Sequence, residues 1–193
     1  AAALSLLVPL SASAQAWPTK PVRIIVAYPP GGATDLQARL VAAKLNERWG
    51  VPVIVENKPG ANTVIATDMV AKAAPDGQTV LLTAMPYALN PMLIAKLPYD
   101  TAKDLVPVTL MATIPNVLVV YPGLPVNSLG DLIKLARAEP GSVSFASTGQ
   151  ATSTHLSGEL FGKMAGLKLN HIPYKGSAPA HLDQLARQVR GGG

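Results

Sequence analysis

The sequence contains no cysteine. This absence excludes a disulfide framework, a thiolate zinc site, a cysteine nucleophile and a lipid-modified N-terminal cysteine. Charged residues are also scarce, at 14% of the 193 residues, and aromatic residues make up only 5%. With so little charge and 49% hydrophobic residues, the chain is not intrinsically disordered, and it holds enough apolar material for a packed core.

Basic residues are few and scattered. The chain has 16 Lys and Arg against 11 Asp and Glu, a net charge of +5, and nowhere do three basic residues stand in a row. Nucleic-acid-binding proteins concentrate such charge on one face or helix, so the pattern argues against a nucleic-acid partner. The small positive excess mildly favours an anionic ligand.

The first 16 residues form a segment of their own. They carry no charge, and an apolar run over 4–10 is followed by small residues at positions 14 and 16. This pattern is typical of a secretory signal peptide cut before Trp17, and it is shorter than the ~20 residues that span a membrane. We interpret residues 1–16 as a signal-peptide remnant and expect a periplasmic protein of a Gram-negative bacterium. The alternative is an apolar N-terminal helix of a cytosolic protein.

Strands and helices are predicted to alternate in the first part of the chain. Strands are expected at 22–28, 51–56 and 78–83, each a short apolar run closed by turn residues. The helix after the first strand is expected to open with Thr34 as its cap and Asp35 as a first-turn anion. A second helix separates the other two strands. This order predicts a parallel, doubly wound sheet with right-handed crossovers.

The pattern loosens beyond residue 85, where three prolines break up a connecting stretch. Further strands are expected at 106–112, 117–121, 142–146 and 167–172. Further helices are expected at 128–138, 152–165 and 176–189. The two sets of elements predict two α/β lobes, residues 17–104 and 105–193, joined by a hinge.

Two loops combine glycine and hydroxyl groups at a helix start, Tyr28–Asp35 and Ser147–His155. Ligands of parallel sheets bind at the carboxyl ends of strands, where such loops lie. Glycine lets the backbone approach a ligand closely, and each helix start attracts an anion by roughly 0.3–1 kcal/mol. One loop from each lobe would hold a carboxylate without an arginine clamp. The pattern fits equally well with two ordinary capped turns.

No motif of an enzyme, a cofactor site or a metal site is found. The sequence has no G-x-G-x-x-G after a strand and no G-x-S-x-G. His155, His171 and His181 are 16 and 10 residues apart, a spacing that matches no metal-binding pattern. We therefore predict no catalytic activity, no cofactor and no metal.

The titratable residues of the two loops have open roles. His155 either donates a hydrogen bond to a ligand or serves as a local structural donor. Asp35 either contacts a ligand proton or a bridging water, or stabilises the first turn of its helix, which is the favoured interpretation. His171 and His181 are interpreted as structural or surface residues.

Several short motifs follow one another along the chain. They are Trp17–Val26, Tyr28–Asp35, Val55–Ala61, Ala74–Gly77, Leu97–Asp100, Pro115–Val120, Ser147–His155, Gly158–Phe161 and His171–Gly176. In this order they resemble the periplasmic solute receptors of tripartite tricarboxylate transporters, often called the Bug family, over nearly all of 17–180.

The resemblance implies an α/β fold of the type II periplasmic-binding-protein class, a two-lobe Venus flytrap with parallel-rich sheets. It implies a monomeric receptor, without catalytic activity, that captures a small carboxylate for the membrane subunits of a transporter. The expected ligand is a di- or tricarboxylate, an acidic amino acid or a related organic acid. A ligand-sensing module for a membrane signalling partner is the alternative, because the same pocket would serve both. The ligand loops of the family fall on Tyr28, Gly31, Gly32, Ala33, Thr34 and Asp35, and on Ser147, Thr148, Gly149, Thr152 and His155.

The sequence departs from the family pattern at three places. Asn62 and Thr63 stand where small residues are usual, so Thr63 is expected to alter that turn or to narrow the edge of the cleft. Ala151 replaces a frequent glycine and is expected to stiffen the second loop. After Gly176 the returning segment of the family does not follow. We therefore expect a truncated or frameshifted receptor whose incomplete lobes expose strand edges and apolar surface, and a non-functional fragment is a further alternative.

Overall fold

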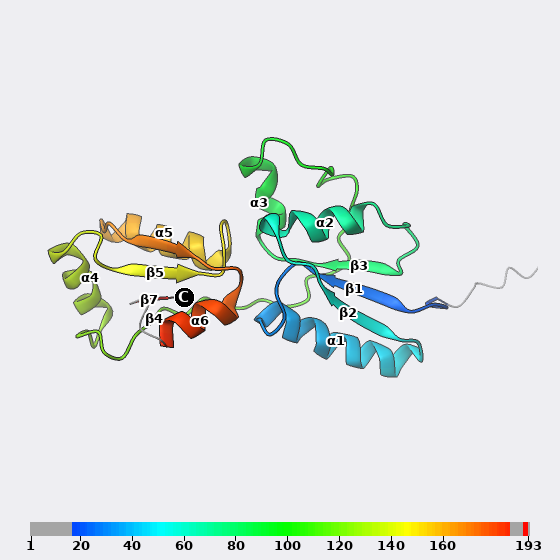
Figure 1. The fold of residues 1–193 in the computed structure, drawn as a ribbon, viewed down its shortest axis with the longest axis horizontal. Helices are drawn as coiled ribbons and strands as arrows, with labels where there is room; N and C mark the ends of the chain where they lie inside the picture. Colours follow the sequence, from blue (N-terminus) through cyan, green and yellow to red (C-terminus); the bar gives the residue numbers. More distant parts are fainter. Residues whose placement is uncertain (1–16, 186–190, 193) are drawn as a thin grey trace, which may run out of the picture.

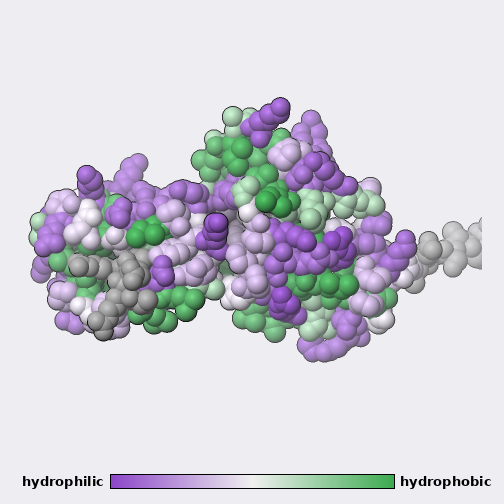
Figure 2. Space-filling model, viewed as in Figure 1, coloured by the Kyte–Doolittle hydropathy of each residue, from purple (hydrophilic) through white to green (hydrophobic). Residues whose placement is uncertain are grey.

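The computed structural model describes residues 17–185 and 191–192, which form two α/β lobes lying side by side (Figure 1). The signal-peptide interpretation of residues 1–16 lies outside the described residues. Among the described residues, no helix is both long and apolar enough to cross a membrane. The space-filling view shows a waist between the lobes, and the apolar residues of this face lie in several separate patches (Figure 2).

The first lobe is built on a three-stranded parallel sheet with its first strand in the centre. The strands are β1 (Val22–Val26), β2 (Val53–Asn57) and β3 (Thr79–Leu82), in the order β2-β1-β3. Helix α1 (Ala33–Trp49) covers one face, and α2 (Val64–Ala71) covers the other (Figure 1). The predicted doubly wound parallel sheet is confirmed.

Strand β1 supplies the core on both faces of this sheet, because successive side chains of a strand point to opposite sides. The cluster against α1 consists of Ile24, Val26, Ala38 and Ala42. The cluster against α2 consists of Ile25, Ala27, Ala66 and Val70. Burial on both faces explains why β1 is an almost unbroken apolar run in the sequence.

A third helix, α3 (Pro86–Leu93), forms where only a connecting stretch was predicted. Proline is tolerated in the first turn of a helix, where its missing N–H would have no partner, so Pro86 begins this helix rather than breaking it. Asn90 of α3 is fully buried and exchanges two hydrogen bonds with Asn62, at 2.7 and 2.8 Å. They hold the turn η1 (Ala61–Thr63), where all three residues have positive φ. Because Thr63 is buried, the structure favours an altered turn over a narrowed cleft edge.

The second lobe has a four-stranded mixed sheet. Its strands are β4 (Val119–Val120), β5 (Ser144–Ser147), β6 (Asn170–Pro173) and β7 (Gly191–Gly192), in the order β4-β7-β5-β6. Only the β4–β7 pair is antiparallel. The helices are α4 (Leu129–Ala138), α5 (Ser153–Ala165) and α6 (Ser177–Leu185). The buried core at α4 consists of Leu124, Leu132, Ala136 and Val143.

Of the elements predicted for the second lobe, one strand is wrong, one strand is shorter than predicted, and one helix is described only in its first part. The strand expected at 106–112 does not form, and of 117–121 only β4 is a strand. Strands need a hydrogen-bonding partner, and 105–118 instead runs as an exposed link between the lobes, with Val108 86% exposed. The glycines of β7 were not predicted as a strand, because glycine has low strand propensity. Of the helix expected at 176–189, the first part is α6, and residues 186–190 lie outside the described residues.

Candidate functional site

The β1–α1 loop is held by a buried carboxylate. Asp35 Oδ2 accepts hydrogen bonds from Gly31 N at 2.9 Å and Arg39 Nε at 3.0 Å, and Oδ1 accepts one from Asn57 Nδ2 at 2.9 Å. Asn57 Nδ2 also donates to Tyr28 O at 3.0 Å. The loop is thereby tied both to α1 and to the end of β2. The hydrogen bond from Arg39, with those from Gly31 and Asn57, lowers the pKa of Asp35 to about 2.

The predicted cap of α1 is wrong. The helix begins at Ala33, and Gly32 is its N-cap, so Thr34 already lies inside the first turn. Gly32 makes no side-chain cap bond, and Asp35 instead reaches back to the N–H of Gly31. Because both oxygens of Asp35 are engaged, the structure favours its supporting role over direct contact with a ligand.

Tyr28 anchors the start of the same loop. Its side chain packs against both core clusters of the first lobe, and burial raises its pKa to about 12. Gly31 has a φ of +82°, a conformation that glycine adopts without strain. The first turn of α1, from Ala33 onward, then offers backbone N–H groups that have no partner within the helix.

The β5–α5 loop is held by its own hydroxyl groups. Thr152 is the N-cap of α5, where its Oγ1 accepts from His155 N at 3.4 Å and donates to Gly149 O at 2.7 Å. Ser147 Oγ donates to Gly149 O at 3.1 Å and accepts from Gly149 N at 3.3 Å. Ser147 and Thr152 are buried, so the more exposed part of the loop is 148–150.

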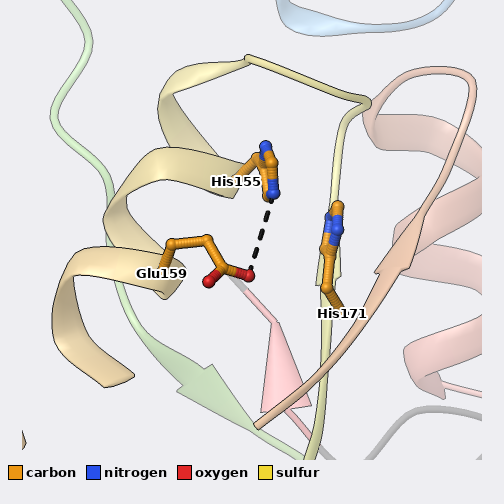
Figure 3. A group of neighbouring side chains, drawn as sticks. All are labelled: His155, Glu159 and His171. Atoms are coloured by element: carbon orange, nitrogen blue, oxygen red, sulfur yellow. Dashed lines mark ion pairs between the residues drawn. The ribbon is translucent and has the colours of Figure 1, made fainter. Parts of the chain in front are cut away.

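Two histidines far apart in the sequence stack beside this loop (Figure 3). The ring centroids of His155 and His171 are 4.0 Å apart, and the ring planes differ by 16°. His155 Nδ1 accepts a hydrogen bond from Ala151 N at 3.1 Å, so the proton of the neutral ring is on Nε2, which lies 3.8 Å from Glu159 Oε1. His171 Nε2 lies 2.6 Å from Ser147 Oγ. Both rings therefore hold the β5–α5 loop through polar contacts, His155 with Ala151 N and His171 with Ser147 Oγ.

These contacts favour structural roles for both histidines. His155 Nδ1 accepts a local hydrogen bond, and His171 is half-buried, with its pKa lowered by burial and by His155. The ligand atoms of His155, Glu159 and His171 lie within 4.8 Å of one another. The lone pair of an imidazole lies in the ring plane, so two stacked rings do not direct their lone pairs at one ion. Sequence reasoning missed Glu159, which lies four residues after His155 and so on the same helix face.

A third segment, residues 174–177, runs from the end of β6 into the first residue of α6. It joins the two loops and was not among the predicted ligand residues. Gly176 N donates to Thr148 O at 3.1 Å, which places the segment beside the β5–α5 loop. It also reaches the first lobe, because a Cβ placed on Gly32 would lie 3.1 Å from Ser177 Oγ. The sequence signal was the same as in the other loops, a glycine and a hydroxyl between a strand and a helix.

The starts of α1, α5 and α6 therefore meet where the lobes touch (Figure 1). Each helix start carries a partial positive charge and free N–H groups. Neither Tyr28–Asp35 nor Ser147–His155 contains a lysine or an arginine, whereas the third segment contains the exposed Lys175. The arrangement can bind an anion through the backbone of both lobes.

Comparison with known proteins shows the family. Residues 37–191 match the Tripartite tricarboxylate transporter family receptor. The chain belongs to this family. BugT of Bordetella pertussis is 45% identical over 92% of this chain and 55% of its own length. The chain spans about half the length of the curated relatives it matches.

Solved structures of similar proteins share the fold. A protein of R. palustris solved with adipate is 37% identical, with a TM-score of 0.87 over 91% of this chain and 59% of that one. MatC from Rhodopseudomonas palustris with bound malate is 28% identical, with a TM-score of 0.80 over 91% of this chain and 60% of that one. A periplasmic transporter is 39% identical, with a TM-score of 0.85 over 92% and 60%. The predicted family and the predicted periplasmic-binding-protein fold are confirmed.

Proposed function

We propose that this chain binds a small carboxylate between its two lobes, as a receptor of a tripartite tricarboxylate transporter. The observation that carries the proposal is the meeting of three helix starts from two lobes, which offers N–H groups and positive dipole ends to one anion. Similar proteins have been solved with adipate and with malate. Both are dicarboxylates, so a dicarboxylate is the first ligand to test.

The predicted site residues divide into two proposed roles. The backbone N–H groups of Gly32, Ala33 and Thr34 would contact the ligand. Those of Gly31, Thr148 and Gly149 already donate to Asp35, Thr154 and Ser147, so these three residues would shape the loops around the ligand. Tyr28, Asp35, Ser147, Thr152 and His155 would hold these loops in place, because their polar atoms are buried or already engaged. Recognition by backbone N–H groups would select a carboxylate without fixing the number of its charges.

We propose no catalytic activity for this site. Ser147 Oγ and His171 Nε2 are 2.6 Å apart, the spacing of a nucleophile and its base. Ser147 is fully buried, however, and its Oγ also lies within hydrogen-bond distance of the C=O and N–H of Gly149. A substrate could not reach this oxygen without opening the loop.

The cellular setting belongs to the same proposal. We expect a monomeric protein in the periplasm that delivers its ligand to the membrane subunits of the transporter. The alternative, a sensing module for a membrane signalling partner, would use the same site. Co-purification with detergent-solubilised transporter subunits or with a sensor-kinase ectodomain, each with and without ligand, distinguishes the two.

Thermal unfolding of the full chain with adipate, with malate and with neutral 1,6-hexanediol tests the proposal. A ligand at about 100 times its Kd stabilises a folded receptor by about 2.7 kcal/mol. At ~2–4 °C per kcal/mol, the midpoint should rise by roughly 5–11 °C with a dicarboxylate and stay unchanged with the diol. Equal shifts with the diol, or no shift with any carboxylate of a wider panel, would contradict carboxylate binding. A chain without a cooperative transition would support the non-functional fragment.

A further inference from the structure

Two close contacts join the lobes, and each has a glycine on one side. A Cβ on Gly32 of the first lobe would lie 3.1 Å from Ser177 Oγ of the second. A Cβ on Gly176 of the second lobe would lie 3.3 Å from Pro29 Cδ of the first. Both distances are tighter than most contacts that real Cβ atoms make. The lobes approach each other this closely because neither position carries a side chain.

The backbone of Gly32 does not explain why this residue is a glycine. Its φ of −85° and ψ of 172° are values that any residue adopts. Gly32 is also the N-cap of α1, a position where serine is favoured over glycine. Local structure would therefore accept Ser at position 32, and among the neighbours of this position only Ser177 Oγ is in tight contact with the added Cβ. Gly176 is less informative, because its φ of +113° requires glycine in any case.

We propose that Gly32 and Ser177 form the closing contact of the two lobes, and that the bare Gly32 sets how tightly they close on the ligand. Gly32 is in this sense a positioning residue. A site divided between two lobes is complete only in the closed state, so the apparent affinity falls with the fraction of closed chains. The predicted effect of Gly32 on ligand affinity rests on the proposed function, whereas the contact between Gly32 and Ser177 does not depend on it.

The first test compares affinity with stability. Gly32→Ser should weaken the binding of adipate or malate, measured by calorimetry, by roughly 5- to 150-fold, the usual range of coupling between sites. Its midpoint of urea unfolding should stay the same or rise, because serine is the better N-cap. Gly130→Ser near the start of α4 is the matched control, since a Cβ there would meet only Ser128 Oγ at 3.6 Å. This control should leave the affinity unchanged.

A double-variant cycle separates crowding from other effects. If the added side chain collides with the Ser177 hydroxyl, Gly32→Ser should weaken binding less when Ser177→Ala is also present. An effect of Gly32→Ser that is the same in both backgrounds would overturn the proposed contact.

Cross-linking tests the contact without any ligand. Because the chain has no cysteine, the pair Gly32→Cys and Ser177→Cys contains its only two thiols. A disulfide needs Cβ atoms about 3.5–4.5 Å apart, a spacing compatible with the observed contact. Oxidised glutathione, which accepts the two electrons and releases glutathione, should produce an intramolecular disulfide, and adipate or malate should accelerate it. Gly32→Cys alone reports any pairing between chains.

The outcomes distinguish the two proposals. A cross-link in a chain that binds no carboxylate upholds the closing contact and contradicts the proposed function. Carboxylate binding without a cross-link, together with normal affinity of Gly32→Ser, overturns the closing contact and leaves the proposed function standing.

Discussion

The β1–α1 loop of the first lobe and the β5–α5 loop of the second lie in equivalent places, each between a parallel strand and a helix, but different groups hold them. A buried carboxylate paired with Arg39 holds the first loop. Hydroxyl groups and two stacked imidazoles hold the second. The comparison shows that one loop geometry can be supported by charged or by neutral groups. The choice decides how much each support contributes and at which pH it is lost.

The charged support should give the largest effect. Asp35→Asn removes the anion that pairs with Arg39. The new amide also presents either its NH₂ group, which cannot accept, or its neutral oxygen, a weaker acceptor, to the N–H donors of Gly31 and Asn57. Hydrogen bonds to charged groups contribute about 1.5–3 kcal/mol each, so the free energy of unfolding in urea should fall by about 2–3 kcal/mol. Asp131, a partly exposed carboxylate in the first turn of α4, supplies the control: Asp131→Asn should cost less. Equal losses in the two variants would contradict a special role for the buried Asp35.

The neutral support should give a smaller effect. His155→Phe keeps an aromatic ring in the stack but removes the acceptor of the Ala151 N–H. Leaving one such group unsatisfied should lower the free energy of unfolding by about 1–2 kcal/mol. His181→Phe on the exposed face of α6 should change it by no more than about 0.5 kcal/mol. If His155→Phe is as mild as this control, the imidazole does not hold the loop.

The two supports should fail at different pH. The folded pKa of His171 lies below its ordinary 6.5, so the unfolded chain takes up more protons as the pH falls below about 6.5, and stability declines in mild acid. The pKa of Asp35 falls from 3.8 to about 2, so its contribution is complete above about pH 4 and is lost toward pH 2. Urea unfolding over this range should show both declines. His171→Asn should remove the first and Asp35→Asn the second, and an unchanged profile in either variant would break the comparison.

The smallest effect concerns backbone strain in the second loop. Ala151 has a φ of +57°, a left-handed conformation that costs a non-glycine residue roughly 1–2 kcal/mol. Ala151→Gly relieves this strain but gains flexibility in the unfolded chain, so the net stabilisation should be at most about 1 kcal/mol. Ala88→Gly in α3, where the helix favours alanine, should instead destabilise the chain by about 1 kcal/mol. Destabilisation by both variants would show that Ala151 carries no strain.

The sequence predicted best where local signals agreed. The apolar run of β1, the turn residues around it and the glycines before α1 and α5 indicated strands, helices and the loops between them in their observed places. Prediction from the sequence failed where contacts with distant parts of the chain decide whether a segment forms a strand. Val106, Val108 and Leu110 alternate as in a strand, but no strand in the described part of the chain pairs with them. Conversely, Gly191 and Gly192 have little strand propensity and pair with both β4 and β5.

The sequence by itself determined the alternation of elements, the parallel sheet of the first lobe, the two glycine-containing loops and the family motifs, because these depend on periodicity and on residues close together in the chain. Only the tertiary structure decided that Asn57 holds Asp35, that His155 stacks on His171, and that Ser177 faces Gly32. Each of these contacts joins residues of different elements or lobes, or depends on how a side chain turns. The number of residues between two such partners along the chain does not indicate how close they lie in the folded protein.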